Sequence, residues 1–277
     1  VIAPFAQSPH IGGFGVFDQP VELSSRMESS TLIEVVETPV GTLTGTWGFT
    51  DRHGWIPHPI HHLVNDYEEL KIFHYAVEHL SPEPPPADYE NFLAAQEEVG
   101  EEGIATTSLL NTPLMHLIET AWGLESTYYL LHDYREMVED ILHCLHKAQL
   151  LTVQRIAESP ARVVIEYENT SSTLLSPGIF RRYCLPYLNE HACILREAGK
   201  IFLVHMCGKL RVFLDDLATG EFSGITDISP PPTGDRGLDE MAACLPGKVL
   251  VGGIDATTYI KTDLADVEET VAGLIER

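Results

Sequence analysis

Short strand-like segments alternate with helical segments from about residue 103 to the end of the chain. The strand-like runs cover residues 103–107, 162–167, 200–205, 222–228 and 248–254, and the helical patterns cover 115–131, 133–158, 177–197, 210–217, 238–245 and 263–276. Strands and helices that alternate in this way form βαβ units, in which the strands lie parallel in one sheet. The sequence therefore predicts an α/β protein.

The number of strands favours a closed barrel. With the segment that opens the chain (1–17) and a strand near Thr31, the sequence offers about seven strand positions. A (β/α)8 TIM barrel needs eight. We therefore expect residues 1–277 to form a single TIM-barrel domain that lacks its last βα unit in this chain. Residues 31–50 are expected to form a β-hairpin excursion that turns at Pro39-Val40-Gly41.

The region 52–63 is rich in histidine, and two interpretations were weighed for it. A metal site would use some of its four imidazoles, but proline and glycine interrupt the region and no acidic or cysteine partner stands at a ligand-like spacing. A surface loop that leads into a helix at 66–80 is the favoured interpretation. A further helix is expected at 88–99, after the proline-rich segment 81–87. The histidines concerned are His53, His58, His61 and His62.

The strand at 200–205 ends in His205-Met206-Cys207-Gly208, the most informative motif of the chain. Side chains two residues apart in an extended segment point to the same face, so His205 and Cys207 can reach one ion. Imidazole nitrogen and thiolate sulfur are ligands that zinc prefers. Gly208 is expected to supply backbone freedom for a turn. Taken alone, the pair is equally compatible with a packed imidazole and an inert buried thiol.

Composition limits the classes of partner. The net charge is −24, with 17 Lys and Arg residues, so a nucleic-acid partner is not expected. No apolar run approaches the roughly 20 residues of a membrane span, and the N-terminus lacks the pattern of a signal peptide. A cytoplasmic location follows as the default expectation. Five scattered cysteines do not form a disulfide framework.

The order of several motifs resembles the uroporphyrinogen decarboxylase superfamily. The motifs are Leu175-Ser176-Pro177, His205-Met206-Cys207-Gly208-Lys209, Ile225-Thr226-Asp227 with the following Pro230-Pro231-Pro232-Thr233-Gly234-Asp235, and Gly252-Gly253-Ile254-Asp255. The resemblance implies a (β/α)8 barrel. It also implies one of two activities, the decarboxylation of a porphyrinogen or a zinc-dependent methyl transfer between a corrinoid and a thiol or similar acceptor.

Two features bring the chain nearer to the methyltransferases. Decarboxylases of this superfamily carry an arginine-rich first loop for the substrate's carboxylates, whereas residues 7–18 contain no Arg or Lys. The His-x-Cys pair and the hairpin turn Thr38-Pro39-Val40-Gly41-Thr42 resemble the methyltransferases instead. In those proteins a third zinc ligand, a cysteine, stands in the last barrel strand. We expect that ligand beyond Arg277, and the chain then to be a fragment.

The expected function is a zinc-dependent methyl transfer. His205 and Cys207 would bind Zn²⁺, the methyl group would pass between methylcobalamin or a corrinoid protein and a small-molecule acceptor, and Glu168, Asp227 and Asp255 would support the chemistry. For Asp227 and Asp255, structural or capping roles are equally compatible with the sequence. Two alternatives remain: a decarboxylase-like lyase that depends on Asp or Glu, and a non-catalytic barrel that binds a ligand. The methyl donor, the acceptor and the oligomeric state are not determined by the sequence.

Overall fold

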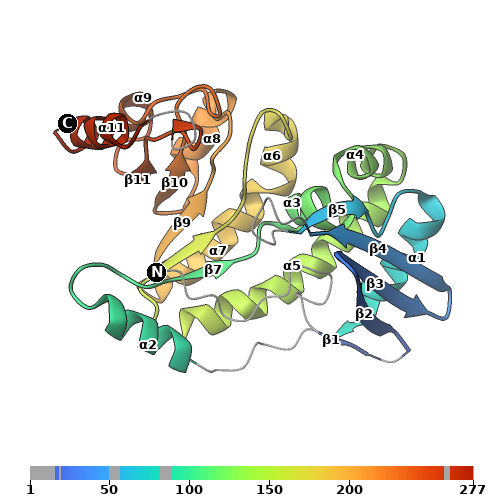
Figure 1. The fold of residues 1–277 in the computed structure, drawn as a ribbon. Helices are drawn as coiled ribbons and strands as arrows, with labels where there is room; N and C mark the ends of the chain where they lie inside the picture. The colour runs from blue at the N-terminus through green and yellow to red at the C-terminus, as the bar shows by residue number, and fades with distance from the viewer. Residues whose placement is uncertain (1–15, 19, 50–56, 82–88, 259–262, 277) are drawn as a thin grey trace. The chain divides into compact units, whose positions relative to one another are not determined.

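A computed structural model describes residues 16–18, 20–49, 57–81, 89–258 and 263–276 (Figure 1). Within these residues the chain forms two compact units. Unit 1 contains residues 89–111 and 156–276, and unit 2 contains residues 16–81 and 112–155. The expectation of a single barrel domain stays a prediction. The expected opening strand and most of the loop at 7–18 lie outside the described residues.

Unit 1 is built on a parallel five-stranded sheet in the order β11-β10-β9-β8-β7. Its α/β architecture confirms the alternation that the sequence predicts. The strands are β7 (Thr106–Leu109), β8 (Val163–Glu166), β9 (Ile201–His205), β10 (Gly224–Ile228) and β11 (Val249–Gly252). Its helices are α2 (Glu90–Val99), α6 (Pro177–Tyr183), α7 (Leu185–Glu197), the 3-10 helix η4 (Arg211–Phe213), α8 (Leu214–Thr219), α9 (Leu238–Cys244) and α11 (Leu264–Ile275).

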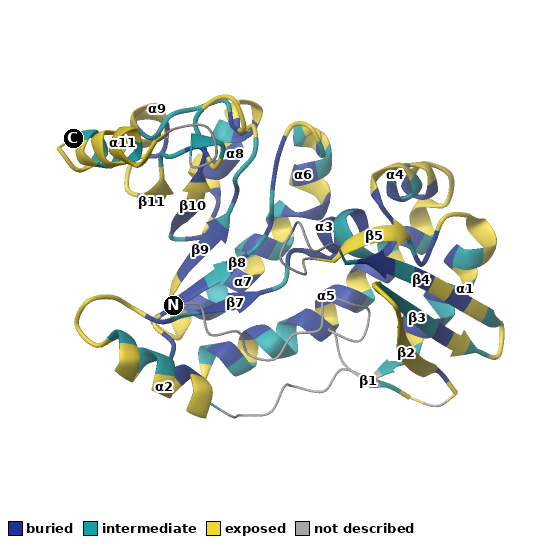
Figure 2. Ribbon diagram, viewed as in Figure 1, coloured by how far each residue is buried: buried dark blue, intermediate teal, exposed yellow. Residues whose placement is uncertain are grey.

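The central strands of this sheet are buried because apolar side chains cover both faces (Figure 2). Phe202 and Val204 of β9 and Ile225 of β10 are almost fully buried, and α7 packs against β9. The outer strand β11 is different, since Val249 and Val251 remain 45% and 48% exposed. Among the described residues, β7 and β11 each pair with one strand, so the sheet is open rather than a closed barrel.

Unit 2 contains a four-stranded antiparallel sheet in the order β2-β3-β4-β5. Its strands are β2 (Glu22–Glu28), β3 (Thr31–Thr38), β4 (Gly41–Gly48) and β5 (His58–His61), and a small pair joins β1 (Val16–Phe17) to β6 (Leu80–Ser81). Its helices are α1 (Tyr67–Glu78), α3 (Pro113–His116), the π-helical η3 (Leu117–Ala121), α4 (Leu124–Asp133) and most of α5 (Arg135–Ala157).

The hairpin predicted at 31–50 is formed by β3 and β4, which pair antiparallel from Thr31↔Gly48 to Thr38↔Gly41. Counting a strand near Thr31 toward the parallel sheet was therefore wrong, because β3 bonds on both sides to antiparallel neighbours. The loop expected at 52–63 was wrong in part. His58–His61 form β5, whose register on β4 is broken by an irregularity. The sequence also missed β2, a strand whose residues are all exposed.

Two predicted helices are interrupted. The helix expected at 115–131 breaks at Gly123, whose backbone has a φ of +77° and whose α-carbon faces the His62 ring too closely for a side chain. The helix expected at 177–197 separates into α6 and α7 at Cys184, with Pro186 in the first turn of α7. Its N-cap is as predicted, because Ser176 Oγ accepts a hydrogen bond from the Ile179 backbone N–H at 3.3 Å.

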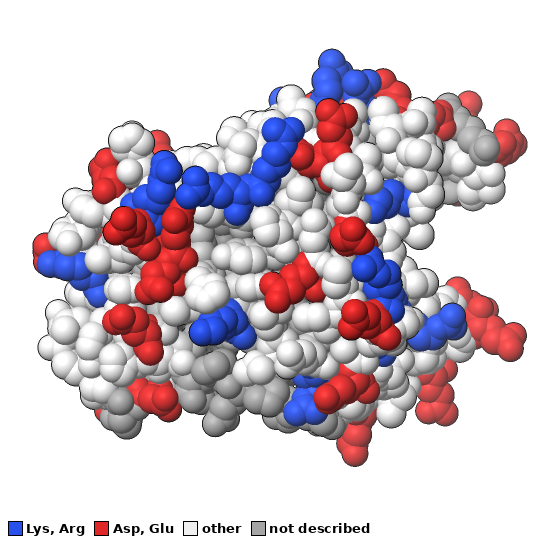
Figure 3. Space-filling view, turned by 180° about the vertical axis from the view of Figure 1, so that it is seen from behind, with Lys and Arg blue, Asp and Glu red and all other residues white. Residues whose placement is uncertain are grey.

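Basic side chains on the surface lie beside acidic ones, as Figure 3 shows for one face of the molecule. The ion pairs Arg196–Glu221 and Arg236–Glu240 are examples of such neighbours. Within the described residues, no helix is long and apolar enough to cross a membrane.

Candidate active site

His205 and Asp227 form the centre of a polar cluster at one edge of the parallel sheet. Because β8, β9 and β10 are parallel neighbours, the residues that end these strands meet at the same edge. His205 Nδ1 donates a hydrogen bond to Asp227 Oδ2 at 2.8 Å. The register pairs Thr226 with His205, and Asp227 follows with a left-handed backbone, φ +62°. Such a conformation is uncommon for a residue other than glycine, although Asp adopts it more readily than most, and residues in strained conformations cluster at active sites.

The two groups shift each other's pKa. Burial lowers the pKa of His205, but its hydrogen bonds to Asp227 and Cys207 and their charges outweigh burial and raise the pKa to about 9. The hydrogen bond from His205 lowers the pKa of the Asp227 carboxyl. The imidazole is therefore held by a carboxylate at Nδ1, with the Cys207 thiol as a second partner.

Tyr167 and Asn169, neither of which was predicted as a site residue, complete the cluster from the segment that follows β8. The ring centroid of Tyr167 lies 5.1 Å from that of His205. Burial and the charge of Asp227 raise the pKa of the Tyr167 hydroxyl. The Asn169 backbone N–H donates to the His205 carbonyl at 2.9 Å, and Asn169 Oδ1 lies 3.9 Å from Cys207 Sγ. Asn169 also has a left-handed backbone, φ +52°. The signal in the sequence that could have indicated Asn169 is its position directly after the strand predicted at 162–167.

Gly208 has a different role from the one predicted. Its backbone φ is not in the left-handed region, so a turn does not require glycine there. A Cβ at this position would lie 2.3 Å from Ser171 Cβ and 2.7 Å from the Thr170 carbonyl oxygen. The two loops are joined further because the Lys209 backbone N–H donates to Ser171 Oγ at 3.1 Å. Glycine is needed because the segment after β9 passes directly against the segment after β8.

The loop after β10 lies on the same segment. Asp235 Oδ1 accepts hydrogen bonds from the backbone N–H groups of Leu210 and Arg211 at 2.8 and 3.1 Å. Gly234 is packed so closely that a Cβ added to it would overlap the Ser229 carbonyl. The same Cβ would lie 3.3 Å from the Gly208 carbonyl oxygen. The loops that follow β8, β9 and β10 therefore fix one another, and with them the position of Cys207.

The other predicted residues lie in two different settings. Glu168 is fully buried one residue beyond Tyr167. Asp255, which is 4% exposed, accepts hydrogen bonds from the Thr233 backbone N–H at 2.9 Å and from Thr257 N–H and Oγ1 at 2.8 and 2.5 Å. These bonds hold the pKa of the Asp255 carboxyl well below its usual range. Asp255 thus joins two loops by hydrogen bonds, as the alternative of a structural role requires. A catalytic role for Glu168 or Asp255 stays a prediction.

A buried carboxyl and imidazole pair behind the sheet was not anticipated. His191 Nδ1, on α7, lies 2.8 Å from Glu166 Oε2, on β8, and both side chains are fully buried. Burial raises the pKa of Glu166 well above its ordinary value and lowers that of His191 to about 4. Burial therefore favours the uncharged form of both groups. Its place under α7 makes it part of the helix packing.

The chain offers two zinc ligands at this edge. His205 and Cys207 are both partly buried and interact with each other. Asp227 on Nδ1 is the kind of carboxylate partner that metal-binding histidines use. Among the described residues, no further His, Cys, Asp or Glu completes a three-ligand group with them in which the ligand atoms lie within 4.8 Å. The donor set therefore fits zinc in kind and supplies two of its positions.

Among the described residues, no other cysteine or histidine forms a three-ligand group with His205 and Cys207. Cys184 is buried at the junction of α6 and α7, Cys193 Sγ lies 3.4 Å from Arg196 Nη2, and Cys244 is exposed at the end of α9. His62 Nδ1 bonds to the Thr120 carbonyl oxygen at 3.1 Å, while His53 lies outside the described residues.

Comparisons with known proteins give a family and a fold. The family model described as “Uroporphyrinogen decarboxylase (URO-D)” matches residues 112–277. Among the solved structures that match is a methyltransferase from Methanosarcina mazei, with a TM-score of 0.50 and 15% sequence identity. The match covers 78% of this chain and 63% of the methyltransferase, so the chain spans less than two thirds of that protein's length. No curated protein matches the chain.

Proposed function

The chain belongs to the uroporphyrinogen decarboxylase family, and from that premise we propose that it is a zinc-dependent methyltransferase with a corrinoid as methyl carrier. The observation that carries the proposal is the His205–Asp227 pair with Cys207 beside it at the carboxyl edge of the sheet. An imidazole fixed by a carboxylate, next to a thiol, is suited to a zinc ion. The shared fold with a protein named a methyltransferase is consistent with this choice.

In this proposal His205 and Cys207 bind the zinc, which, when bound, lowers the pKa of a thiol acceptor. A third protein ligand is expected from a further strand, as the resemblance implies. Asp227 keeps the Nδ1 proton of His205 in place, so that Nε2 is available as a ligand. Tyr167 packs against the imidazole and fixes its plane. The methyl group passes between the acceptor and methylcobalamin or a corrinoid protein.

We further propose that β7 to β11 are five consecutive strands of a (β/α)8 barrel. Five parallel strands in sequential order, joined by segments that contain helices, are the repeating unit of that fold. Functional residues of such barrels stand at the carboxyl ends of the strands. His205 and Asp227 lie at those ends of β9 and β10.

A matched pair of cysteine variants tests the metal and the reaction together. The protein is purified without chelators, its zinc content is measured, and methyl transfer from methylcobalamin to a thiol is followed by the cobalamin spectrum. We expect Cys207→Ser to bind less zinc than Cys244→Ser and to lose methyl transfer, and Cys244→Ser to retain the zinc content and activity of the unaltered protein, because Cys244 is exposed at the end of α9. Equal zinc content in the two variants would refute the ligand assignment.

The second candidate is a decarboxylase-like lyase, which the description of the matching family favours. In that case the buried Glu168 and the exposed Asp227 would be the essential residues and the metal would be irrelevant. Carbon dioxide release from an acid substrate that survives Cys207→Ser but not Asp227→Asn would support it. Binding of methylcobalamin without turnover would instead indicate a non-catalytic binding protein.

A further inference from the structure

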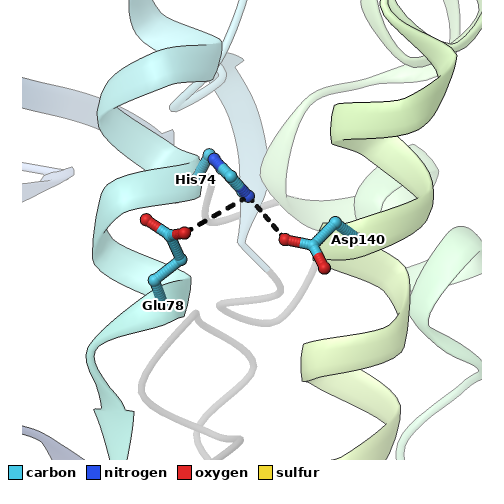
Figure 4. A group of neighbouring side chains, drawn as sticks. All are labelled: His74, Glu78 and Asp140. Atoms are coloured by element: carbon cyan, nitrogen blue, oxygen red, sulfur yellow. Dashed lines mark hydrogen bonds and ion pairs between the residues drawn. The ribbon is translucent and has the colours of Figure 1, made fainter.

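A second cluster of ligand-type side chains lies in unit 2, between helices α1 and α5 (Figure 4). His74 and Glu78 are one helical turn apart on α1, so their side chains emerge on the same face. Asp140 on α5 points at the same imidazole. The side chain of His74 is 21% exposed, and those of Glu78 and Asp140 are 52% exposed.

The distances suit a small divalent cation. His74 Nε2 lies 2.7 Å from Asp140 Oδ2 and 4.0 Å from Glu78 Oε1, and the three ligand atoms lie within 4.8 Å of one another. Zinc at bonds of about 2.0–2.1 Å holds its tetrahedral ligand atoms about 3.3 Å apart. The two observed distances lie on either side of that value. Side-chain rotations that move each ligand atom by less than about 1 Å would therefore place all three atoms around one ion.

The two carboxylates have no lysine or arginine partner among the described residues. Within the described part of the chain, neither Glu78 nor Asp140 pairs with Lys or Arg, since Lys71 pairs with Glu68. Cys144 lies one turn beyond Asp140 on α5. Burial and the charges of Asp140 and Glu78 raise the pKa of its thiol, against the opposite effect of Lys147. Two carboxylates that pair with no Lys or Arg of the described residues thus lie beside one imidazole, an arrangement that favours a cation.

We propose that His74, Glu78 and Asp140 form a divalent metal site that binds Zn²⁺ and joins α1 to α5 within unit 2. One imidazole and two carboxylates are among the common protein ligands of zinc. Three protein ligands from two helices hold the helices at a fixed spacing. The site is separate in sequence and chemistry from His205 and Cys207, and it does not depend on the proposed methyl transfer.

The test measures zinc binding in the chain of residues 1–277 carrying Cys207→Ser, which removes the thiolate ligand of the other site. Zn²⁺ affinity is determined by competition with a chromophoric chelator, and thermal unfolding is followed with and without Zn²⁺. We expect one equivalent bound at micromolar concentration or below, together with a Zn²⁺-dependent rise in Tm. His74→Gln and Asp140→Asn should each weaken binding at least tenfold and abolish the rise in Tm.

The control is His132→Gln, because His132 also bonds an aspartate on a helical surface, with Nδ1 2.8 Å from Asp133 Oδ1, but belongs to no three-ligand group in the described residues. It should bind Zn²⁺ as the Cys207→Ser parent does. Glu78→Gln serves as a second, exposed variant in case a change at His74 or Asp140 prevents folding. Equal affinity in the His74, Glu78 and His132 variants, or binding by the parent at millimolar Zn²⁺ alone, would overturn the proposal.

Discussion

Replacing Gly208 by alanine tests whether the loops at the carboxyl edge of the sheet position Cys207. The added Cβ would lie 2.3 Å from Ser171 Cβ, 2.7 Å from Ser171 Oγ and 2.7 Å from the Thr170 carbonyl oxygen. Carbon atoms pack at about 3.5–4.0 Å, so the two loops must separate by about 1 Å. A side-chain rotation cannot relieve this overlap, because the Thr170 carbonyl belongs to the backbone.

The energetic cost has two parts. Overpacking of this kind costs about 1–3 kcal/mol. Separation of the loops also weakens two hydrogen bonds, Lys209 N–H to Ser171 Oγ at 3.1 Å and Ser172 N–H to the Lys209 carbonyl at 3.0 Å, each of which contributes about 1 kcal/mol. We therefore expect Gly208→Ala to lower the free energy of unfolding by about 2–4 kcal/mol. The same movement carries Cys207 away from His205 and should lower the zinc content.

Urea unfolding followed by circular dichroism measures the first effect, and metal analysis measures the second. With a slope of about 2 kcal/mol per M, the midpoint should fall by about 1–2 M. Gly178→Ala is the control, since Gly178 lies in α6 and a Cβ there meets Ser176 Oγ at an ordinary 3.9 Å. It should leave the midpoint unchanged or raise it slightly. A midpoint for Gly208→Ala equal to that of Gly178→Ala would refute the close-packing argument.

Three further predictions follow from the other contacts. Glu166→Gln removes the buried carboxyl, whose stabilising contribution is complete below pH 4.5 and lost as pH rises through its raised pKa. The variant's unfolding free energy minus that of the wild type should therefore grow as pH rises above about 4.5, and parallel pH profiles would contradict the raised pKa of Glu166. The loss of stability that His191 causes as pH falls from 6.5 toward about 4 should appear in both proteins. Asp227→Asn should weaken zinc binding at the His205 site about 10–100-fold in chelator competition, because the carboxylate that orients His205 is lost. An unchanged affinity would refute the orienting role of Asp227. Asp255→Ala leaves the Thr233 and Thr257 donors without their acceptor, so the free energy of unfolding measured in urea should fall by about 1–3 kcal/mol. A fall of less than about 0.5 kcal/mol, the size seen for surface substitutions, would show that Asp255 does not hold the two loops together.

Much of unit 1 could be predicted because its elements carry local signals. The apolar run 201–204 is typical of a strand covered on both faces, and the Ser176-Pro177 pair is typical of a helix start. The parallel arrangement follows from the alternation of strands and helices. The same alternation places His205 and Asp227 at one edge of the sheet, so the position of the candidate site was predicted with the fold.

The sequence by itself determined the parallel α/β pattern, the hairpin at 31–50 and the His205–Cys207 pair, because each depends on neighbours along the chain. The tertiary structure decided which residues face that pair. Tyr167 and Asn169 reach His205, and Gly208 lies against Thr170. Elsewhere, His74 meets Asp140 across two helices. The members of these pairs are 36 to 66 residues apart in the sequence, and β5 pairs with β4 in an irregular register. Such contacts depend on register, backbone angles such as the φ of +62° at Asp227, and close packing between loops. These quantities are set by the whole fold, because local sequence preferences fix neither the separation of loops nor the direction of a side chain at the end of a strand.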